Sequence, residues 1–374
     1  MLIKNVTAYP LRYPEPNDHD NLRYITLARV ETDDGTVGWG ECISQWPEAA
    51  LAVKPIIEQG LGPVIVGRDP LDTYAIWLAM KEQSWWYGEG GIASFALSAI
   101  DMAVWDLKGK ALGVPLYKLF GGKLHDRLRA CASTHPSSAN VDDMAEELAV
   151  HARNGFTAIK VGFGKKGYAN LGYDGKRDIA FVAAVREALG DDIDFMIDLG
   201  HPVRWEVAQA IRMVRAMEQY NIRWIEDPLR TLDWEGYPRL RAAIQTQIAT
   251  GEDLWTVEDY RRLLSQNIGD IILIDPGRSE GVTGYLKVIE MTVQAHRYIN
   301  AHSWSSALNT AASIHLTAAS PNYIVMEMKP TPSPMQHELV YNPINPQDGW
   351  ITIPEEPGLG VEVNEDVVQK YVFE

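Results

Sequence analysis

Two patterns of hydrophobic and polar positions divide the chain at about residue 122. Before that point, β-branched runs at 25–31 and 36–41 flank the polar turn Asp33-Asp34-Gly35, which predicts paired strands. From about Pro55 to Leu119, apolar residues recur instead at helical spacing. The first 122 residues therefore predict a separate α+β domain.

After residue 122, short apolar runs alternate with helical stretches, and each run ends in a polar residue. From the third run end onward, the steps are 28, 26, 23, 27 and 25 residues, the length of one strand, one helix and two short loops. Eight such units over about 200 residues predict a (β/α)₈-type barrel. The run ends are Ser133, Lys160, Asp198, Glu226, Glu252, Asp275, His302 and Glu327.

The last unit lacks a helical pattern, because Pro330, Pro332 and Pro334 follow the eighth run. The expected fold class is therefore α/β, a modified TIM barrel of (β/α)₇β type with an N-terminal α+β capping domain. We expect the capping domain at 1–122, the barrel at 123–335, and a tail at 336–374 that packs back on the capping domain.

In such a barrel, residues at the carboxyl ends of the strands face one common site. Three successive strand ends carry Asp198, Glu226 and Glu252. Alone, each acid fits a helix cap or a surface salt bridge, but three converging carboxylates would repel one another without a cation between them. Oxygen-only ligands favour a hard ion, Mg²⁺ or Mn²⁺, over zinc.

The composition narrows the classes of partner. A formal net charge of −16 over 374 residues argues against nucleic acid and anionic membranes as partners. It also means that an anionic substrate needs a local cation. The chain has two cysteines far apart and lacks an apolar run of membrane-spanning length, which predicts a reduced, cytoplasmic protein.

Two further strand ends offer proton-transfer groups. His302 could be a structural histidine, but Asp275 one strand earlier could orient it as a general base. Lys160 could be a solvated strand end, yet it precedes a glycine-containing loop that lets a ligand approach. On strands two and seven, Lys160 and His302 should face opposite sides of a bound acid.

These parts fit removal of a proton alpha to a carboxylate. That proton is very weakly acidic, because its loss leaves a dianionic enediolate. A divalent ion on the carboxylate oxygens stabilises the developing charge. Glu327, if protonated, could donate a hydrogen bond to the second oxygen.

The motifs resemble the mandelate racemase group of the enolase superfamily over nearly the whole chain. They include DGTVGWGE at 34–41, AIDMAVWD at 99–106, WIEDP at 224–228 and GE at 251–252, with the Asp275 segment. The resemblance implies that Asp198, Glu226 and Glu252 bind Mg²⁺, that Lys160 is the base on one face, and that His302 with Asp275 is the base on the other. It also implies that Glu327 is a hydrogen-bonding acid. Two capping loops, near 14–23 and 44–47, would close the barrel mouth, with His19 and Trp46 as candidate substrate contacts.

The chain departs from the family pattern at several positions. Ala158 stands where we align the first lysine of the family's Lys-x-Lys, which removes a neighbouring cation and favours a protonated Lys160. His201, after Gly200, could bind substrate, act as a general acid or be a plain loop residue. Glu280 replaces a common glycine, and Trp85 with Trp86 is expected to pack at the domain interface.

We expect a Mg²⁺-dependent lyase that dehydrates a sugar acid, an aldonate or aldarate. Racemisation, epimerisation or lactone cycloisomerisation of a hydroxy acid is the alternative, and a non-catalytic sugar-acid-binding protein is the alternative outside enzymes. Family members are usually oligomers, so a homo-oligomer is expected. The sequence does not name the acid, because specificity lies in loops.

Overall fold

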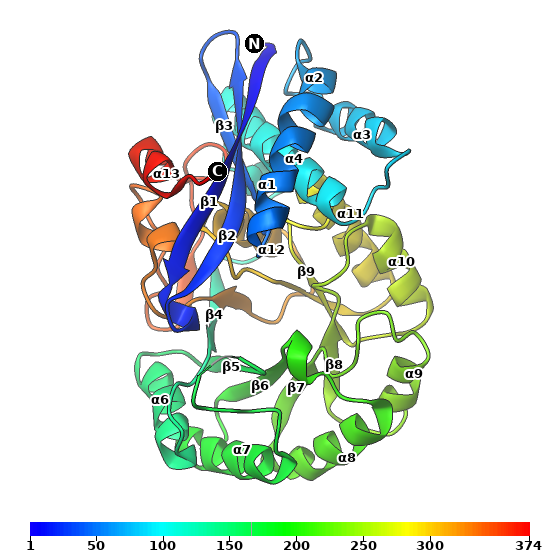
Figure 1. Cartoon of the computed structure of the whole chain (residues 1–374), viewed down its shortest axis with the longest axis vertical. Helices are drawn as coiled ribbons and strands as arrows, with labels where there is room; N and C mark the ends of the chain where they lie inside the picture. Colours follow the sequence, from blue (N-terminus) through cyan, green and yellow to red (C-terminus); the bar gives the residue numbers. More distant parts are fainter. Residues whose placement is uncertain (166) are drawn as a thin grey trace.

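The computed structural model describes residues 1–165 and 167–374 and shows a capping unit above a barrel (Figure 1). The cap begins with an antiparallel sheet of β1 (Ile3–Glu15), β2 (Asn21–Thr32) and β3 (Val37–Cys42), in that order. A short 3₁₀ turn, η1 (Pro16–Asp18), joins the first two strands. The helical part comprises α1 (Pro47–Pro55), the π-helical η2 (Ile56–Leu61), α2 (Gly62–Ile65), α3 (Thr73–Ser84), α4 (Ile92–Leu112) and α5 (Leu116–Leu119).

The long helix α4 packs directly on β3 because two glycines of the strand leave room for its backbone. A Cβ on Gly40 would lie 2.1 Å from the Ala99 carbonyl oxygen, and one on Gly38 would lie 2.2 Å from that of Ala103. Real side chains do not fit at such distances. The glycines of the DGTVGWGE motif therefore set the close strand–helix contact that forms the core of the cap.

The barrel contains eight parallel strands with a helix between each consecutive pair, as expected. Its strands are β4 (Arg127–Thr134), β5 (Ala158–Phe163), β6 (Asp194–Leu199), β7 (Ile222–Glu226), β8 (Gln247–Thr250), β9 (Ile271–Ile274), β10 (Tyr298–Ala301) and β11 (Met326–Met328). Its helices are α6 (Val141–Arg153), α7 (Gly175–Leu189), α8 (Val207–Met217), α9 (Gly236–Arg241), α10 (Val257–Ser265), α11 (Gly281–Gln294) and α12 (Ala307–Ala318).

Side chains alternate along each barrel strand between the barrel interior and the surrounding helices. On β5, Ile159, Val161 and Phe163 join the large core that includes the helices, whereas Ala158 joins a smaller cluster with interior residues such as Trp224. Lys160 and Gly162 share the parity of Ala158. Lys160 and Gly162 therefore belong to the interior face, near the carboxyl end of the strand.

The tail contacts both parts of the molecule. It contains the π-helical η5 (Pro334–Glu338), β12 (Trp350–Thr352) and α13 (Glu365–Tyr371). β12 pairs antiparallel with β4 of the barrel, and α13 contacts β1 of the cap. The residue limits 122/123 and 335/336 that we assigned to the domains stay predictions.

A buried ion pair ties the tip of the β1–β2 hairpin to the barrel. Lys329, just after β11, places its Nζ 2.6 Å from Glu15 Oε2, and both side chains are fully buried. Asn17 and Thr331 exchange two further hydrogen bonds of 2.7 and 2.9 Å beside that pair. The hairpin tip is therefore fixed at one edge of the barrel mouth.

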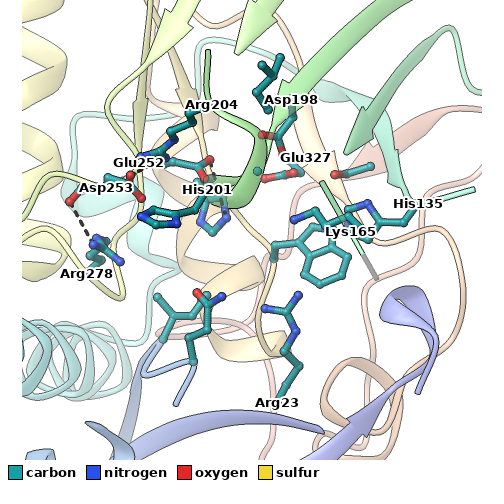
Figure 2. Close-up of a pocket in the computed structure, with 17 residues that line it drawn as sticks. Arg23, His135, Lys165, Asp198, His201, Arg204, Glu252, Asp253, Arg278 and Glu327 are labelled. Atoms are coloured by element: carbon teal, nitrogen blue, oxygen red, sulfur yellow. Dashed lines mark hydrogen bonds and ion pairs between the residues drawn. The ribbon is translucent and has the colours of Figure 1, made fainter. Parts of the chain in front are cut away.

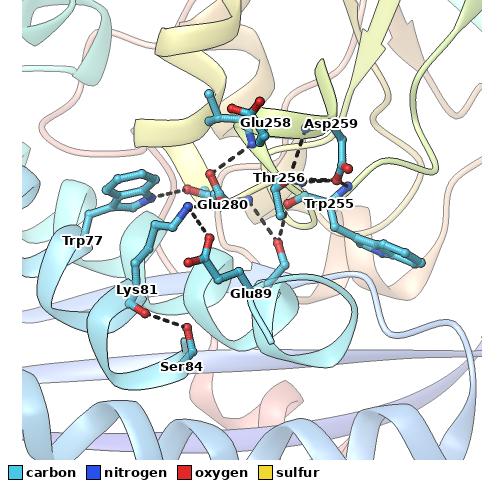
Figure 3. Close-up of polar contacts among 12 residues, drawn as sticks. Trp77, Lys81, Ser84, Glu89, Trp255, Thr256, Glu258, Asp259 and Glu280 are labelled. Atoms are coloured by element: carbon cyan, nitrogen blue, oxygen red, sulfur yellow. Dashed lines mark hydrogen bonds and ion pairs between the residues drawn. The ribbon is translucent and has the colours of Figure 1, made fainter. Parts of the chain in front are cut away.

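A second contact between cap and barrel is centred on Glu280, which directly precedes α11 as its N-cap with φ 61° (Figure 3). Its carboxylate lies 2.7 Å from Lys81 Nζ and accepts the Val257 N–H at 3.2 Å. Its carbonyl accepts the indole N–H of Trp77 at 3.0 Å. The left-handed φ explains why a glycine suits this position.

The expectation that Trp85 and Trp86 pack at this interface is wrong. Their side chains are 61% and 80% exposed and contact each other edge-on beyond the end of α3. Within the part of the chain that the structure describes, we found no helix with the length and apolar character needed to span a bilayer.

Candidate active site

A cavity opens where the barrel strands end beneath the cap (Figure 2). Cap residues Arg23 and Gln45 form one wall, and the loops after the barrel strands form the remainder. The polar and aromatic barrel residues that line it are Ser133, His135, Lys165, Asp198, His201, Arg204, Glu252, Asp253, Arg278, His302, Trp304 and Glu327.

Three acids predicted as metal ligands come together at this end of the barrel. Asp198 on β6 lies in register with Glu226, the last residue of β7, and Glu252 follows β8. Asp198 and Glu252 line the cavity, whereas Glu226 is fully buried and lines a smaller hollow beneath it with Glu252. Burial, together with the neighbouring carboxylates, raises the pKa of Glu226 well above its usual range, although Lys160 opposes that shift.

This donor set fits a hard divalent cation. Glu252 Oε2 is buried, yet it has no hydrogen-bond partner among residues 1–165 and 167–374. A buried carboxylate oxygen without a donor is costly, and a cation supplies the missing partner. Ionised Asp198 and Glu226 would complete a site of carboxylate oxygens.

A second acidic group lies next to this set. Asp227, Glu252 and Asp253 offer oxygens within 4.8 Å of one another. However, Arg204 lies 3.4 Å from Asp227 and 2.5 Å from Asp253, and the Thr250 hydroxyl donates to Asp227 at 2.6 Å. A cation shared by the two aspartates would have to displace these donors, so this group is the poorer metal site.

Lys160 faces carboxylates rather than the large cavity. Its Nζ lies 2.5 Å from Glu226 Oε1 and 2.9 Å from Glu327 Oε1, and the residue is 5% exposed. Burial alone would lower the pKa of Lys160, but Glu226 and Glu327 raise it well above its usual range. The ammonium is thus held in its charged form below the site.

His302 and Asp275 form the expected pair. His302 Nδ1 lies 2.6 Å from Asp275 Oδ2, and the other oxygen of the fully buried Asp275 accepts the Gly277 N–H at 2.7 Å. This leaves His302 Nε2 toward the cavity, 3.9 Å from Glu252 Oε2. Burial works against protonation, but Glu252 and Asp275 raise the pKa of His302 to about 10. The pair fixes the ring as a proton-transfer group requires.

Both oxygens of Glu327 face hydrogen-bond donors, an arrangement that favours the ionised form over the protonated form in which it could donate a hydrogen bond. One oxygen accepts the Ser303 N–H at 2.8 Å and the other pairs with Lys160. Burial alone would raise the pKa of Glu327, but Lys160 and His302 lower it to about 2. Glu327 therefore serves as an acceptor in this arrangement.

The three candidate substrate contacts lie at different depths. His201 lines the cavity itself. Trp46 lines an outer hollow above it and is 61% exposed. His19 is exposed and lies beside Gly167, where a Cβ would be 3.3 Å from its Nε2, and it does not line either hollow.

Several cavity residues were missed because they follow the strands rather than end them. His135, two residues after Ser133, is 9% exposed and lies against Trp304 at a ring distance of 4.9 Å. Burial lowers the pKa of His135 well below its usual range. The sequence did offer a signal for His135: it continues the alternation of inward-facing residues of β4, two positions after Ser133. Four basic side chains also line the cavity: Arg23, Lys165, Arg204 and Arg278. They supply the local positive charge that an anionic substrate would need in an acidic protein.

The fold and this site define an enolase-like barrel enzyme. Residues 143–367 match the family model of the enolase C-terminal domain-like proteins, and residues 18–121 match that of the mandelate racemase / muconate lactonizing enzyme N-terminal domain. The chain belongs to the mandelate racemase / muconate lactonizing enzyme family of the enolase superfamily, as its motifs indicated.

Its relatives include named acid-sugar enzymes. The chain is 31% identical to D-galactarolactone cycloisomerase of Agrobacterium fabrum, over 93% of this chain and 91% of the relative. It is 31% identical to D-gluconate dehydratase of Thermoproteus tenax, over 96% of this chain and 72% of the relative. The crystal structure of 3,6-anhydro-D-galactonate cycloisomerase from Zobellia galactanivorans superposes with a TM-score of 0.90 at 28% identity, covering 100% of both chains.

Proposed function

We propose that the chain is a Mg²⁺-dependent lyase that dehydrates a sugar acid, an aldonate or aldarate, to a 2-keto-3-deoxy acid. The observation that carries this proposal is the His302–Asp275 pair at 2.6 Å, opening on the same cavity as the metal-binding acids. The D-gluconate dehydratase relative supports the reaction class.

In this proposal, Asp198, Glu226 and Glu252 hold the ion. When bound, Mg²⁺ neutralises charge on the substrate carboxylate and stabilises the enediolate that forms when the alpha proton leaves. The unpartnered oxygen of Glu252 and the raised pKa of Glu226 are what a bound cation would relieve.

The surrounding residues supply proton transfer, positive charge and contacts to the rest of the substrate. His302 exchanges a proton with the substrate through Nε2, while Asp275 keeps the ring oriented. A cation held at Glu252 would offset the carboxylate charge that raises the pKa of His302, which favours the neutral ring that a base requires. Lys160 adds positive charge beneath the carboxylates, and Glu327 accepts hydrogen bonds from Ser303 and Lys160. His201 and the cap residue Arg23 contact the hydroxyl groups or the distal end of the acid.

Lactone cycloisomerisation is the second candidate, because one relative is named D-galactarolactone cycloisomerase and one similar structure is that of a 3,6-anhydro-D-galactonate cycloisomerase. It uses the same proton removal alpha to a carboxylate, but the leaving group is a ring oxygen of the substrate instead of a free hydroxyl. The residues at the barrel end suit both reactions. The two reactions are therefore distinguished by which group of the substrate leaves.

The test is a library of aldonic acids, aldaric acids and their lactones, incubated with Mg²⁺ in H₂O and in D₂O. Formation of a 2-keto acid from an open-chain acid supports dehydration. Turnover of lactones alone would support cycloisomerisation. Neither product nor deuterium uptake at the alpha carbon from any member would refute both, and His302→Asn serves as the matched inactive control.

We further propose that the chain assembles as a homo-oligomer. Two exposed tryptophans, Trp85 and Trp86, support an association surface on the cap. Light scattering of the purified chain tests the assembly, and a monomer at micromolar concentration would refute it.

A further inference from the structure

The interior face of β5 lacks a side chain at the level of the metal-binding acids. Gly162 lies in register with Asp198 on the neighbouring strand, two residues above Lys160. Lys160 is engaged with Glu226 and Glu327 and does not line the large cavity. The strand itself therefore presents no proton-transfer group to a bound acid.

The side chain of Lys165 fills that place from the following loop. A Cβ built on Gly162 would lie 2.7 Å from Lys165 Cε and 2.5 Å from the ring of His135. Gly164 takes φ 74° and donates its N–H to the Leu171 carbonyl at 2.9 Å, so the chain reverses just after the strand. This reversal returns Lys165 over the barrel mouth, where it lines the cavity (Figure 2).

The other cations of the cavity are engaged with protein groups. Arg23 pairs with Asp18 at 2.8 Å, Arg204 pairs with Asp253 at 2.5 Å, and Arg278 donates to the Asp253 carbonyl at 3.0 Å. Among residues 1–165 and 167–374, the ammonium of Lys165 has no ion-pair or hydrogen-bond partner, although the side chain lines the cavity. Its ammonium is thus available to a ligand.

We propose that Lys165 is a catalytic residue that protonates the leaving hydroxyl, from the side of the cavity opposite His302. In the barrel order, β10 and β5 are separated by β11 and β4 on one side and by β6 to β9 on the other. His302 and Lys165 extend from the ends of these strands into one cavity. This assignment rests on the proposed dehydration.

The step is balanced as an anti elimination. His302 takes the alpha proton, and the electron pair of that C–H bond forms the new double bond of the enol. The C3–O bond breaks, and the hydroxyl leaves as water with a proton from the Lys165 ammonium. The enol then becomes the 2-keto-3-deoxy acid as its O–H proton is exchanged, through solvent, for a proton on C3. His302 releases the alpha proton to solvent, and solvent returns a proton to Lys165.

The experiment compares Lys165→Met and Lys165→Arg with wild type on a confirmed substrate and on its 3-deoxy-3-fluoro analogue. Fluoride leaves as an anion and needs no proton from the enzyme. We expect both variants to dehydrate the natural acid at least about 100-fold more slowly, the scale of general acid catalysis. Fluoride release should fall less than about fivefold. Arginine keeps the charge but does not give up its proton.

The controls separate this role from others. Lys176→Met, at an exposed lysine in the first turn of α7, should match wild type on both compounds. His302→Asn should lose both reactions. Circular dichroism and thermal melts show that the variants fold.

Two results would overturn the assignment alone while leaving the dehydratase in place. These are a natural-substrate rate within about threefold of wild type in Lys165→Met, and equal losses on the natural and fluoro compounds. If wild type itself eliminates neither water nor fluoride, the proposed function fails and the role of Lys165 fails with it.

Discussion

Two replacements of Glu280, at the junction of cap and barrel, should show separately how its side-chain contacts and its left-handed backbone affect stability. The contacts stabilise the fold, whereas the backbone conformation destabilises it. The side chain, 1% exposed, binds Lys81 Nζ at 2.7 Å and the Val257 N–H at 3.2 Å. It does so at φ 61°, a conformation that costs a non-glycine residue roughly 1–2 kcal/mol. The hydrogen bond from Trp77 goes to the Glu280 carbonyl and survives any substitution.

The contacts set the expected size of the effect. In Glu280→Ala, the buried Val257 N–H loses its acceptor, which costs about 1–3 kcal/mol. Lys81 keeps Glu89 at 2.8 Å, so the lost ion pair adds only about 1 kcal/mol. The sum is roughly 3 kcal/mol. Glu280→Gly loses the same contacts but removes the strain, at about 0.5–1 kcal/mol of glycine entropy. It should be more stable than Glu280→Ala by about 0.5–1 kcal/mol.

Equilibrium urea unfolding, followed by tryptophan fluorescence and circular dichroism, measures these differences. Glu258→Ala, at a 76% exposed position on α10, is the matched control and should stay within about 0.5 kcal/mol of wild type. A glycine variant less stable than the alanine variant would refute the strain argument. An alanine variant indistinguishable from wild type would refute the contact argument.

Four further predictions concern the site and the core. Lys160→Met leaves Glu226 and Glu327 without their counter-ion; turnover should fall at least about 100-fold on the confirmed acid, and a full rate would remove Lys160 from the mechanism. His302→Asn should abolish alpha-deuterium uptake in D₂O, measured by NMR; undiminished uptake would place the base elsewhere. Asp198→Ala should weaken Mg²⁺ binding about tenfold or more by calorimetry, and unchanged affinity would move the metal to another acid set. Burial lowers the pKa of His315 to about 4. The unfolded state therefore gains a proton first as pH falls, and wild type should lose roughly 3 kcal/mol of stability between pH 6.5 and 4. His315→Gln should lose less in urea titrations; an identical pH profile would contradict this.

The barrel and its acids were predictable because strand periodicity is a local property of the sequence. Apolar runs of regular spacing placed Asp198, Glu226 and Asp275 at or just after strand ends, where the structure has them. These features depend on neighbours a few residues away, so one sequence suffices to read them.

The remaining details depend on packing between distant segments. The position of Lys160 on β5 was predictable, but its engagement by Glu226 and Glu327 arises only when three strands close together. Lys165 lies in a loop without periodicity, and the backbone reversal at Gly164 sets its direction. His135 continues the alternation of β4, but its contact with Trp304 depends on a segment far along the chain. The Trp85–Trp86 pair suggested a packed domain interface, yet it lies exposed past the last turn of α3.

The buried ion pair of Glu15 and Lys329 has a consequence for how substrate enters the cavity and how product leaves it. Separating a fully buried pair leaves two uncompensated charges and costs about 3–5 kcal/mol. The hairpin tip beside Arg23 would thus stand open in one molecule in about 150 to about 5,000. That side of the cavity is a fixed wall, formed before any acid arrives. We therefore expect exchange with solvent through the outer hollow, which both cap segments line, by movement of the loop that carries Trp46. Substitutions in that loop should alter release rates, whereas those at the hairpin tip should alter which acid fits.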